Sequence, residues 1–282
     1  MDAKSVALRG RGQARRAADS TAMAVAARAG FTARGLIYVL VGVIALQIAF
    51  GNGDGSGRQA DRGGALSELA GRPFGAALLW GVGVAFAGMA VWRLSEALFG
   101  GAGENGTKAS KRAAAAARFV FYAFVSVTVL AYAVGNTGSG SGSSDRRTDD
   151  ITARVLTWPG GQWIVGAVGV AVVGAGLWIS LRALMRKFRK HLRTEAMSPR
   201  ARKVTDFLGM VGGAARGVVF AAAGVFALVA AVRHQPGQAK GLDDTLRSFA
   251  DTPAGPWLLT LIALGLVAFG AFSWCNARWR KV

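Results

Sequence analysis

Three arginine residues, each followed four residues later by an aromatic residue, are the side chains of this sequence best suited to bind a ligand. A spacing of four places both members of a pair on one face of a helix. A guanidinium group makes bidentate contacts with phosphate or carboxylate and packs over aromatic rings. The pattern therefore predicts contacts with an anion or with lipid head groups. The pairs are Arg34 with Tyr38, Arg118 with Tyr122, and Arg216 with Phe220.

Two arrangements of these pairs fit the spacing. In the first, the three arginines converge on one axis and bind one anionic group above the aromatic rings. In the second, they point outward to separate lipid head groups and only anchor the helix ends, where long basic side chains reach the membrane surface at little cost. The shared position in a repeat favours the first arrangement, because anchoring alone would tolerate lysine or a shift of one residue.

Groups that could catalyse a reaction or hold a metal are few. Cys275 is the one cysteine, which excludes an internal disulfide and a cage of cysteine ligands. His191 and His234 fall on opposite sides of the membrane in the topology derived below, so they cannot share a metal ion. Glu96 and Arg93 lie near one end of an apolar segment, where we expect a local ion pair. We therefore expect no catalytic residue, no metal and no cofactor.

The segments that carry the arginines are long and apolar. The chain has 282 residues, of which 52% are hydrophobic. A helix rises about 1.5 Å per residue, so about 20 residues cross the ~30 Å hydrocarbon core of a membrane. Six stretches are nearly free of charge and approach this length, namely 33–50, 76–97, 113–134, 162–181, 217–232 and 257–274.

The net charge of +19 is unevenly distributed along the chain. Four segments hold 25 basic and 6 acidic residues, namely 1–34, 93–118, 182–216 and 275–282. The three segments between them hold nine of each sign, namely 51–72, 135–162 and 233–256. Basic residues concentrate in the cytoplasmic segments of membrane proteins. The alternation predicts a multi-pass membrane protein with both termini in the cytoplasm, and it argues against nucleic-acid binding.

Two motifs recur three times. The first, third and fifth stretches share Arg-x3-aromatic-x3-small-x3-Leu, and the others share Gly-x4-Gly-x3-Trp after a Pro-x-Gly. Glycine inside a helix costs about 1 kcal/mol relative to alanine, so its repetition predicts close helix packing. Tryptophan at a helix end predicts an anchor at the membrane interface. The glycines are Gly83, Gly88, Gly169, Gly174, Gly265 and Gly270, and the tryptophans are Trp92, Trp178 and Trp274.

Each repeat is therefore predicted to consist of a helix, an outer loop and a second helix. A short apolar pair in the loop, such as Leu66 with Leu69, predicts a surface helix that ends before the proline. Because every unit crosses the membrane twice, all three units have the same orientation in the membrane. This predicts an all-α bundle of six transmembrane helices with approximate threefold symmetry about the membrane normal. The predicted parts are a disordered basic cytosolic tail, 1–30, and repeats at 31–100, 113–192 and 207–279.

The second repeat is expected to end in a basic amphipathic extension of its second helix, residues 181–193. Its apolar stripe and its lysines and arginines favour a position on anionic lipid of the cytosolic leaflet. A protein partner in the membrane is the alternative.

The repeated motifs resemble the bacterial membrane-protein family called domain of unknown function 1206. The resemblance covers roughly residues 27–279 and implies three two-helix units. The middle copy departs from the pattern, with Phe119 where the others have Gly35 and Gly217, and with Ser126 in place of Gly42. No activity comes with the resemblance.

The sequence favours a non-enzymatic integral membrane protein that acts through helix packing and through contacts with lipid or a partner. A small-solute transporter or channel along the pseudo-threefold axis is the second interpretation, and an accessory subunit of a larger membrane complex is the third. No titratable residue occupies the centre of a predicted span, which argues against a proton-coupled pump.

Overall fold

The computed structural model describes residues 21–50, 60–71, 73–100, 108–134, 144–233, 235, 239–240, 242–250 and 255–281. Six helices are long and apolar enough to cross a membrane, as predicted: α2 (Thr21–Phe50), α4 (Gly75–Phe99), α5 (Ala109–Ala133), α7 (Gly161–Leu184), α8 (Pro199–Arg233) and α10 (Gly255–Trp279). Shorter elements are α3 (Arg62–Ala70), α6 (Ser144–Leu156), α9 (Leu242–Ala250) and the 3-10 turns η1 (Lys187–His191) and η2 (Thr194–Ala196).

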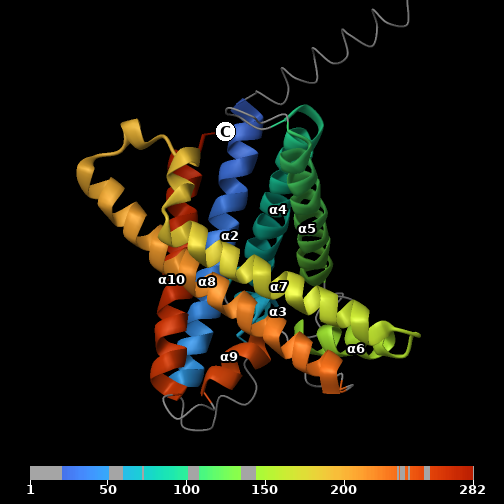
Figure 1. Cartoon of the computed structure of the whole chain (residues 1–282). Helices are drawn as coiled ribbons and strands as arrows, with labels where there is room; N and C mark the ends of the chain where they lie inside the picture. Colours follow the sequence, from blue (N-terminus) through green and yellow to red (C-terminus); the bar gives the residue numbers. More distant parts are fainter. Residues whose placement is uncertain are drawn as a thin grey trace, which may run out of the picture.

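The ends of the long helices form two faces of the molecule. The start of α2 and the end of α10 lie on one face, together with the end of α4, the start of α5 and the α7–α8 connection (Figure 1). We call this face the basic end, because its segments carry the basic excess. The short helices α3, α6 and α9 lie at the opposite end (Figure 1).

Each short helix turns into the next long helix through the Pro-x-Gly motif. In the first repeat, α3 ends at Ala70, three residues before Pro73. Phe74 then adopts a left-handed conformation, with φ of 64°. Gly75 begins α4 so close to α3 that a Cβ would stand 2.6 Å from the carbonyl oxygen of Leu69. The motif therefore fixes a tight corner, and α6 and α9 also end three residues before a proline.

The long helices pair in a cyclic order. The most extensive contacts join α4 to α5, α7 to α8, and α10 to α2. Each pair links the second helix of one repeat to the first helix of the next, and the last pair links the third repeat back to the first. Within repeats, α2 packs on α4 and α8 packs on α10, whereas α5 is not packed along α7. The middle hairpin is therefore open, and the threefold symmetry stays a prediction.

The open hairpin is visible in the directions of the helices. In Figure 1, α7 and α8 run obliquely across the view, whereas α2, α4, α5 and α10 stand nearly upright. The α7–α8 pair is therefore held to the rest of the long helices chiefly through the contact of α8 with α10.

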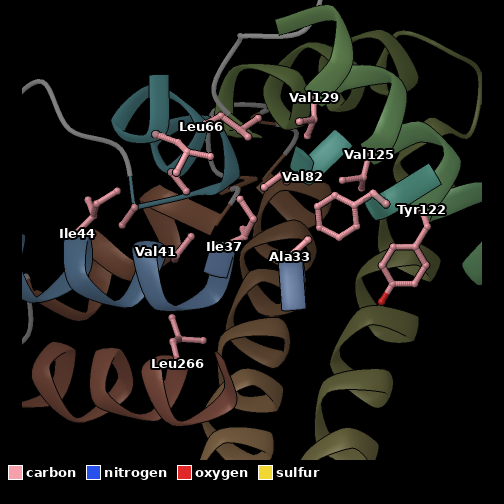
Figure 2. Packing of buried hydrophobic residues seen from close by; sticks show 14 of the residues in the cluster. Ala33, Ile37, Val41, Ile44, Leu66, Val82, Tyr122, Val125, Val129 and Leu266 are labelled. Carbon is pink, nitrogen blue, oxygen red and sulfur yellow. The ribbon is translucent and has the colours of Figure 1, made fainter. Parts of the chain in front are cut away.

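The helix α2 lies at the centre of the bundle, between α4 and α10. Its side chains Ile37, Val41 and Ile44 are at most 6% exposed. Figure 2 shows them directed toward the same apolar cluster as Val82 of α4 and Leu266 of α10. Between membrane helices such side chains stabilise the structure through close van der Waals packing. Among the described residues, apolar side chains thus fill the middle of the bundle.

Glycines bring the paired helices into backbone contact. A Cβ on Gly270 of α10 would stand 2.8 Å from the carbonyl oxygen of Gly35 on α2. A Cβ on Gly176 of α7 would stand 2.5 Å from the backbone nitrogen of Ala221 on α8. Small residues allow such approach between membrane helices. Other motif glycines also face neighbours: Gly83 faces Leu130, Gly88 faces Ala26, Gly169 faces Leu228 and Gly265 faces Ala215.

Gly174 departs from the predicted packing role. A Cβ at this position would meet no atom within 4 Å. Gly174 occupies the place in its repeat that Gly88 occupies in the first, and Gly88 packs on α2 of its own hairpin. By analogy with Gly88 the partner of Gly174 would be α5, which is not packed against α7, whereas by analogy with Gly270, which faces α2, it would be α8. The contact with α8 is made by Gly176 instead, seven residues and almost two full turns after Gly169.

Residues 21–30 of the predicted disordered tail are helical and belong to α2. Residues 1–20 lie outside the described part of the chain. Ala27 is completely buried, and a Cβ on Gly30 would stand 2.5 Å from Cβ of Met89 on α4. Packing on α4 extends the helix by about three turns into a region that composition alone assigns to a tail.

The basic segment after α7 does not continue that helix. α7 ends at Leu184, and Arg186 reverses the chain with φ of 53°. Phe188 then packs edge-to-face on Phe272 of α10, with ring centroids 4.9 Å apart, and Leu192 is 2% exposed. The prediction of an amphipathic helix on the lipid surface is wrong at these two residues, because the bundle itself buries them.

Candidate anion-binding site

Arg34 lies half-buried at the basic end, where three helices meet. Its Nε donates a hydrogen bond to Oγ of Ser273 on α10 at 3.1 Å, and its Nη1 donates to the hydroxyl of Tyr122 on α5 at 3.5 Å. Its guanidinium carbon is 4.8 Å from the ring centroid of Phe31 and 5.3 Å from that of Phe269. Arg34 therefore joins α2, α5 and α10.

Arg216 approaches the same place from α8. Its guanidinium carbon lies 5.0 Å from the ring centroid of Phe269, 5.2 Å from that of Phe220 and 5.8 Å from that of Tyr38. Its Nε is buried and has no hydrogen-bond partner. Arg34 and Arg216 thus share the ring of Phe269, as expected if equivalent positions of the repeat converge.

Arg93 of α4 is buried, with 5% of its surface exposed. Its Nη1 forms the predicted ion pair with Glu96, and its guanidinium carbon lies 3.9 Å from the ring centroid of Trp92. Its Nε is buried without a hydrogen-bond partner. Trp92 is only 4% exposed and packs edge-to-face on Phe31. The predicted role of Trp92 as an interface anchor is therefore wrong, because its ring supports buried arginines.

Arg280, just after α10, is a member of the site that sequence reasoning missed. Its guanidinium carbon lies 4.9 Å from the ring centroid of Phe31 and 5.3 Å from that of Trp92. Its Nη1 donates to Oδ1 of Asn276 at 3.4 Å, whereas its Nε is buried without a partner. Burial, followed by the charge of Arg93, lowers the pKa of Arg280 to about 9. The guanidinium is still charged at pH 7.

A strap formed by residues 187–197 holds Arg280 in place. Leu192 pairs with Arg280 in an isolated bridge, and the N–H groups of Lys281 and Arg193 donate to the carbonyl oxygens of His191 and Trp279 at 2.9 and 2.8 Å. An ion pair between Arg189 and Asp206 ties the strap to α8, with Nε donating to Oδ1 at 2.7 Å. The strap thus connects the site to two helices.

Two further basic groups lie at the margin of the site. Arg118 on α5 is exposed, but it is close enough to Arg93 and Arg280 for their charges to repel. His191 keeps contact with solvent, yet partial burial of its ring lowers its pKa to about 4, with further lowering by Arg280 and Arg182. The imidazole is therefore neutral at pH 7 and adds no charge there.

We call Arg34, Arg93, Arg216 and Arg280 the arginine cluster. Within this cluster, the hydroxyl of Tyr122 accepts a hydrogen bond from Nη1 of Arg34 at 3.5 Å. Within the described residues, the charged neighbours that act on Arg93 and Arg280 include a single carboxylate, that of Glu96. A buried cation without full compensation costs several kcal/mol. The cluster therefore combines excess positive charge with three buried N–H groups that have no acceptor.

The structure brings together only part of the predicted set. One network contains Arg34, Arg216, Tyr38 and Tyr122. Phe220 contacts Arg216 and is 39% exposed. Arg118 lies at the margin of the site. Trp178 and Trp274 are 55% and 43% exposed, and their role as interface anchors stays a prediction. Arg93, Arg280 and Phe269 were missed because they stand outside the arginine motif. The adjacent Trp92 and Arg93 at the end of an apolar stretch were the available signal.

The fold and the cluster define an integral membrane protein of three two-helix repeats with a polar site at one end of its bundle. The chain belongs to the family described as Domain of Unknown Function (DUF1206), which matches residues 29–100, 113–186 and 211–280. A relative in Bacillus subtilis (strain 168), the uncharacterized protein YxxB, is 28% identical over 248 residues, which are 87% of each chain. No solved structure matches the chain.

Proposed function

We propose that this protein is a non-enzymatic protein of the bacterial plasma membrane that binds an anionic group at the basic end of its bundle. The observation that carries the proposal is that the arginine cluster is joined through shared aromatic rings, such as Phe31 between Arg34 and Arg280 and Phe269 between Arg34 and Arg216. Nε of Arg93, Arg216 and Arg280 is buried and without an acceptor. An anionic lipid head group of the cytosolic leaflet or a small anionic solute has the required chemistry.

The energetic argument for a ligand is that the cluster is incompletely compensated. Buried polar groups are nearly always hydrogen-bonded, and hydrogen bonds to charged groups contribute about 1.5–3 kcal/mol each. A phosphate or carboxylate supplies several acceptor oxygens and negative charge in one group. Binding therefore relieves the unpaired N–H groups and the repulsion between guanidinium groups together.

Transport along the axis is less well supported than binding at one end. The middle of α2 packs against α4 and α10 through buried apolar residues such as Val41 and Leu266. A polar solute would have to displace this packing. The filled centre therefore favours a ligand that stays at the basic end.

Arg280→Ala should reduce the amount of anion that remains bound to the purified protein by about tenfold or more, because it removes a charged donor worth about 1.5–3 kcal/mol. Native mass spectrometry of protein extracted in mild detergent measures the bound species directly. Arg278→Ala is the matched control, since Arg278 lies on the same segment and is exposed.

A check of folding is part of this comparison. Both variants should elute as single species in size-exclusion chromatography, and Arg280→Lys, which keeps the charge but not the planar donor group, should bind at an intermediate level. Equal occupancy in the Arg280→Ala and Arg278→Ala proteins, or no bound anion in the wild type, contradicts the proposal.

The orientation is part of the proposal, because the ligand must reach the basic end from the cytoplasm or its leaflet. Reporter fusions after residues 60, 140 and 240 should be external, and fusions after residues 105 and 200 should be internal, in accord with the alternation of basic segments. An external reporter at residue 105 or 200 would place the cluster on the wrong side.

A further inference from the structure

We propose that Asp206 of α8 is a positioning residue of the anion site. Through its ion pair with Arg189 it fixes the register of the strap, and this register directs Arg280 into the arginine cluster. The inference rests on the anion binding proposed above and adds the contact that controls one of its donors. It is carried by the pairing of the strap with the end of α10 and by the contacts of the strap with α8.

The pairing of the strap decides where the side chain of Arg280 points. Two backbone hydrogen bonds, at 2.8 and 2.9 Å, flank the opposed residues Leu192 and Arg280. Opposed residues of an antiparallel pair project their side chains to the same side. Leu192 is 2% exposed, whereas its neighbours His191 and Arg193 are exposed, so this side faces the bundle. A slip of one residue would turn Arg280 outward and bring Lys281 opposite Leu192.

The bridge is too small to fix this register by itself. It comprises one residue pair, and even complete two-stranded ribbons are at best marginally stable in water. The strap also carries four lysines and arginines against one glutamate, so its charge repels that of Arg280. Side-chain contacts with the helices must therefore hold the strap in place.

Two adjacent residues of the strap are held by α8 and α10. The ring of Phe188 packs on Phe272, and a Cβ on Gly209 would stand 2.6 Å from Cζ of this ring. Arg189 donates from Nε to Oδ1 of Asp206 at 2.7 Å and from Nη2 to Oδ2. A bidentate pair fixes the orientation of both groups as well as their distance. Both strap residues belong to η1, which leads directly into the bridge, so their contacts set its register.

Asp206→Asn separates positioning from a simple effect of charge. Loss of a carboxylate at the basic end should strengthen anion binding if the carboxylate acts through its charge alone. If Asp206 positions Arg280, its replacement frees the strap and weakens binding instead. We expect the anion concentration that gives half of the maximal stabilisation to rise about fivefold, which corresponds to the loss of one partly exposed ion pair.

Thermal unfolding of the purified protein in mild detergent measures this concentration, with phosphatidylglycerol added in one arm and inorganic phosphate in the other. The arm in which the wild type responds shows whether the anion is a lipid head group or a free phosphate. Glu195→Gln is the matched control, because it removes an exposed carboxylate from the same strap and should not weaken binding. The backbone N–H groups of Arg193 and Lys281 bond across the bridge. Their hydrogen exchange should become faster in the Asp206→Asn protein and not in the control.

Two further variants test whether Asp206 acts through Arg280. In the Arg280→Ala protein, Asp206→Asn should cause no additional loss of binding, because residues that act through one another have non-additive effects. Gly209→Ala should weaken binding as Asp206→Asn does, since its Cβ displaces the ring of Phe188. The helix itself should tolerate this change, because alanine favours a helix more than glycine does.

The outcomes separate the positioning role from anion binding. Equal or tighter binding by the Asp206→Asn protein, or the same loss with and without Arg280, overturns the positioning role and leaves anion binding intact. If neither phosphatidylglycerol nor inorganic phosphate stabilises the wild type, anion binding itself fails and the positioning role fails with it.

Discussion

Gly176→Leu should strongly destabilise the folded protein, whereas Gly174→Leu, two residues earlier on the same helix, should leave its stability nearly unchanged. A Cβ on Gly176 would stand 2.5 Å from the backbone nitrogen of Ala221 and 2.6 Å from the carbonyl oxygen of Gly217. Backbone atoms cannot rotate away, so a leucine must push α7 and α8 apart. We expect destabilisation on the order of 3 kcal/mol or more.

Thermal unfolding in detergent, followed by size-exclusion chromatography, measures this difference. Gly174→Leu is the matched control, because its Cβ would meet no atom within 4 Å and leucine favours a helix more than glycine does. A lower melting temperature for Gly174→Leu than for Gly176→Leu would mean that α7 is rotated about its axis relative to the structure.

Glu96→Gln should be the most damaging change at the basic end. Glu96 pairs with buried Arg93 and is the one carboxylate among the described charged neighbours of Arg93 and Arg280. Removal of one partner from a buried ion pair costs about 3–5 kcal/mol. Because the Glu96 side chain is 19% exposed, we expect the free energy of unfolding to fall by an amount near the lower value, about 3 kcal/mol.

The loss caused by Glu96→Gln should be partly recovered by an added anion, since ligand binding to the folded state stabilises it. Melting temperatures measured with and without anionic lipid test this recovery. Glu195→Gln, at an exposed residue of the strap, is the control and should melt like the wild type in both conditions. If Glu96→Gln also melts like the wild type in anion-free detergent, the cluster has no uncompensated charge and no need of a ligand.

The helices and their grouping could be predicted from sequence because they follow from local properties. Apolar length determined six spans, and the spacing of glycines and prolines determined where each repeat turns. The convergence of Arg34 and Arg216 also followed from periodicity, since equivalent positions on packed helices face a common region. These features depend on one helix or on a repeat that is visible in the chain.

The rest depends on contacts between segments that have no common pattern. Arg280 stands outside the repeats' arginine motif and reaches the site only because the strap pairs with it. Trp92 and Trp178 share a motif position, but α2 covers the first while the second remains exposed. The difference between Gly174 and Gly176 arises from the missing contact of α5 with α7. No local property of these residues distinguishes the two outcomes.

The pairing of α2 with α10 has a consequence for biosynthesis. α2 is the first of these helices to leave the ribosome, and α10, with 25 residues, is the last. Until α10 is inserted, Gly35 and Gly42 on α2 have no helix to face, because their contacts are to residues of α10. N-terminal parts of a chain fold first during synthesis, but here the earliest helix must wait for the final one. Assembly therefore ends when α10 docks on α2 in the bilayer, and a chain released early keeps a small-residue surface open to other membrane helices.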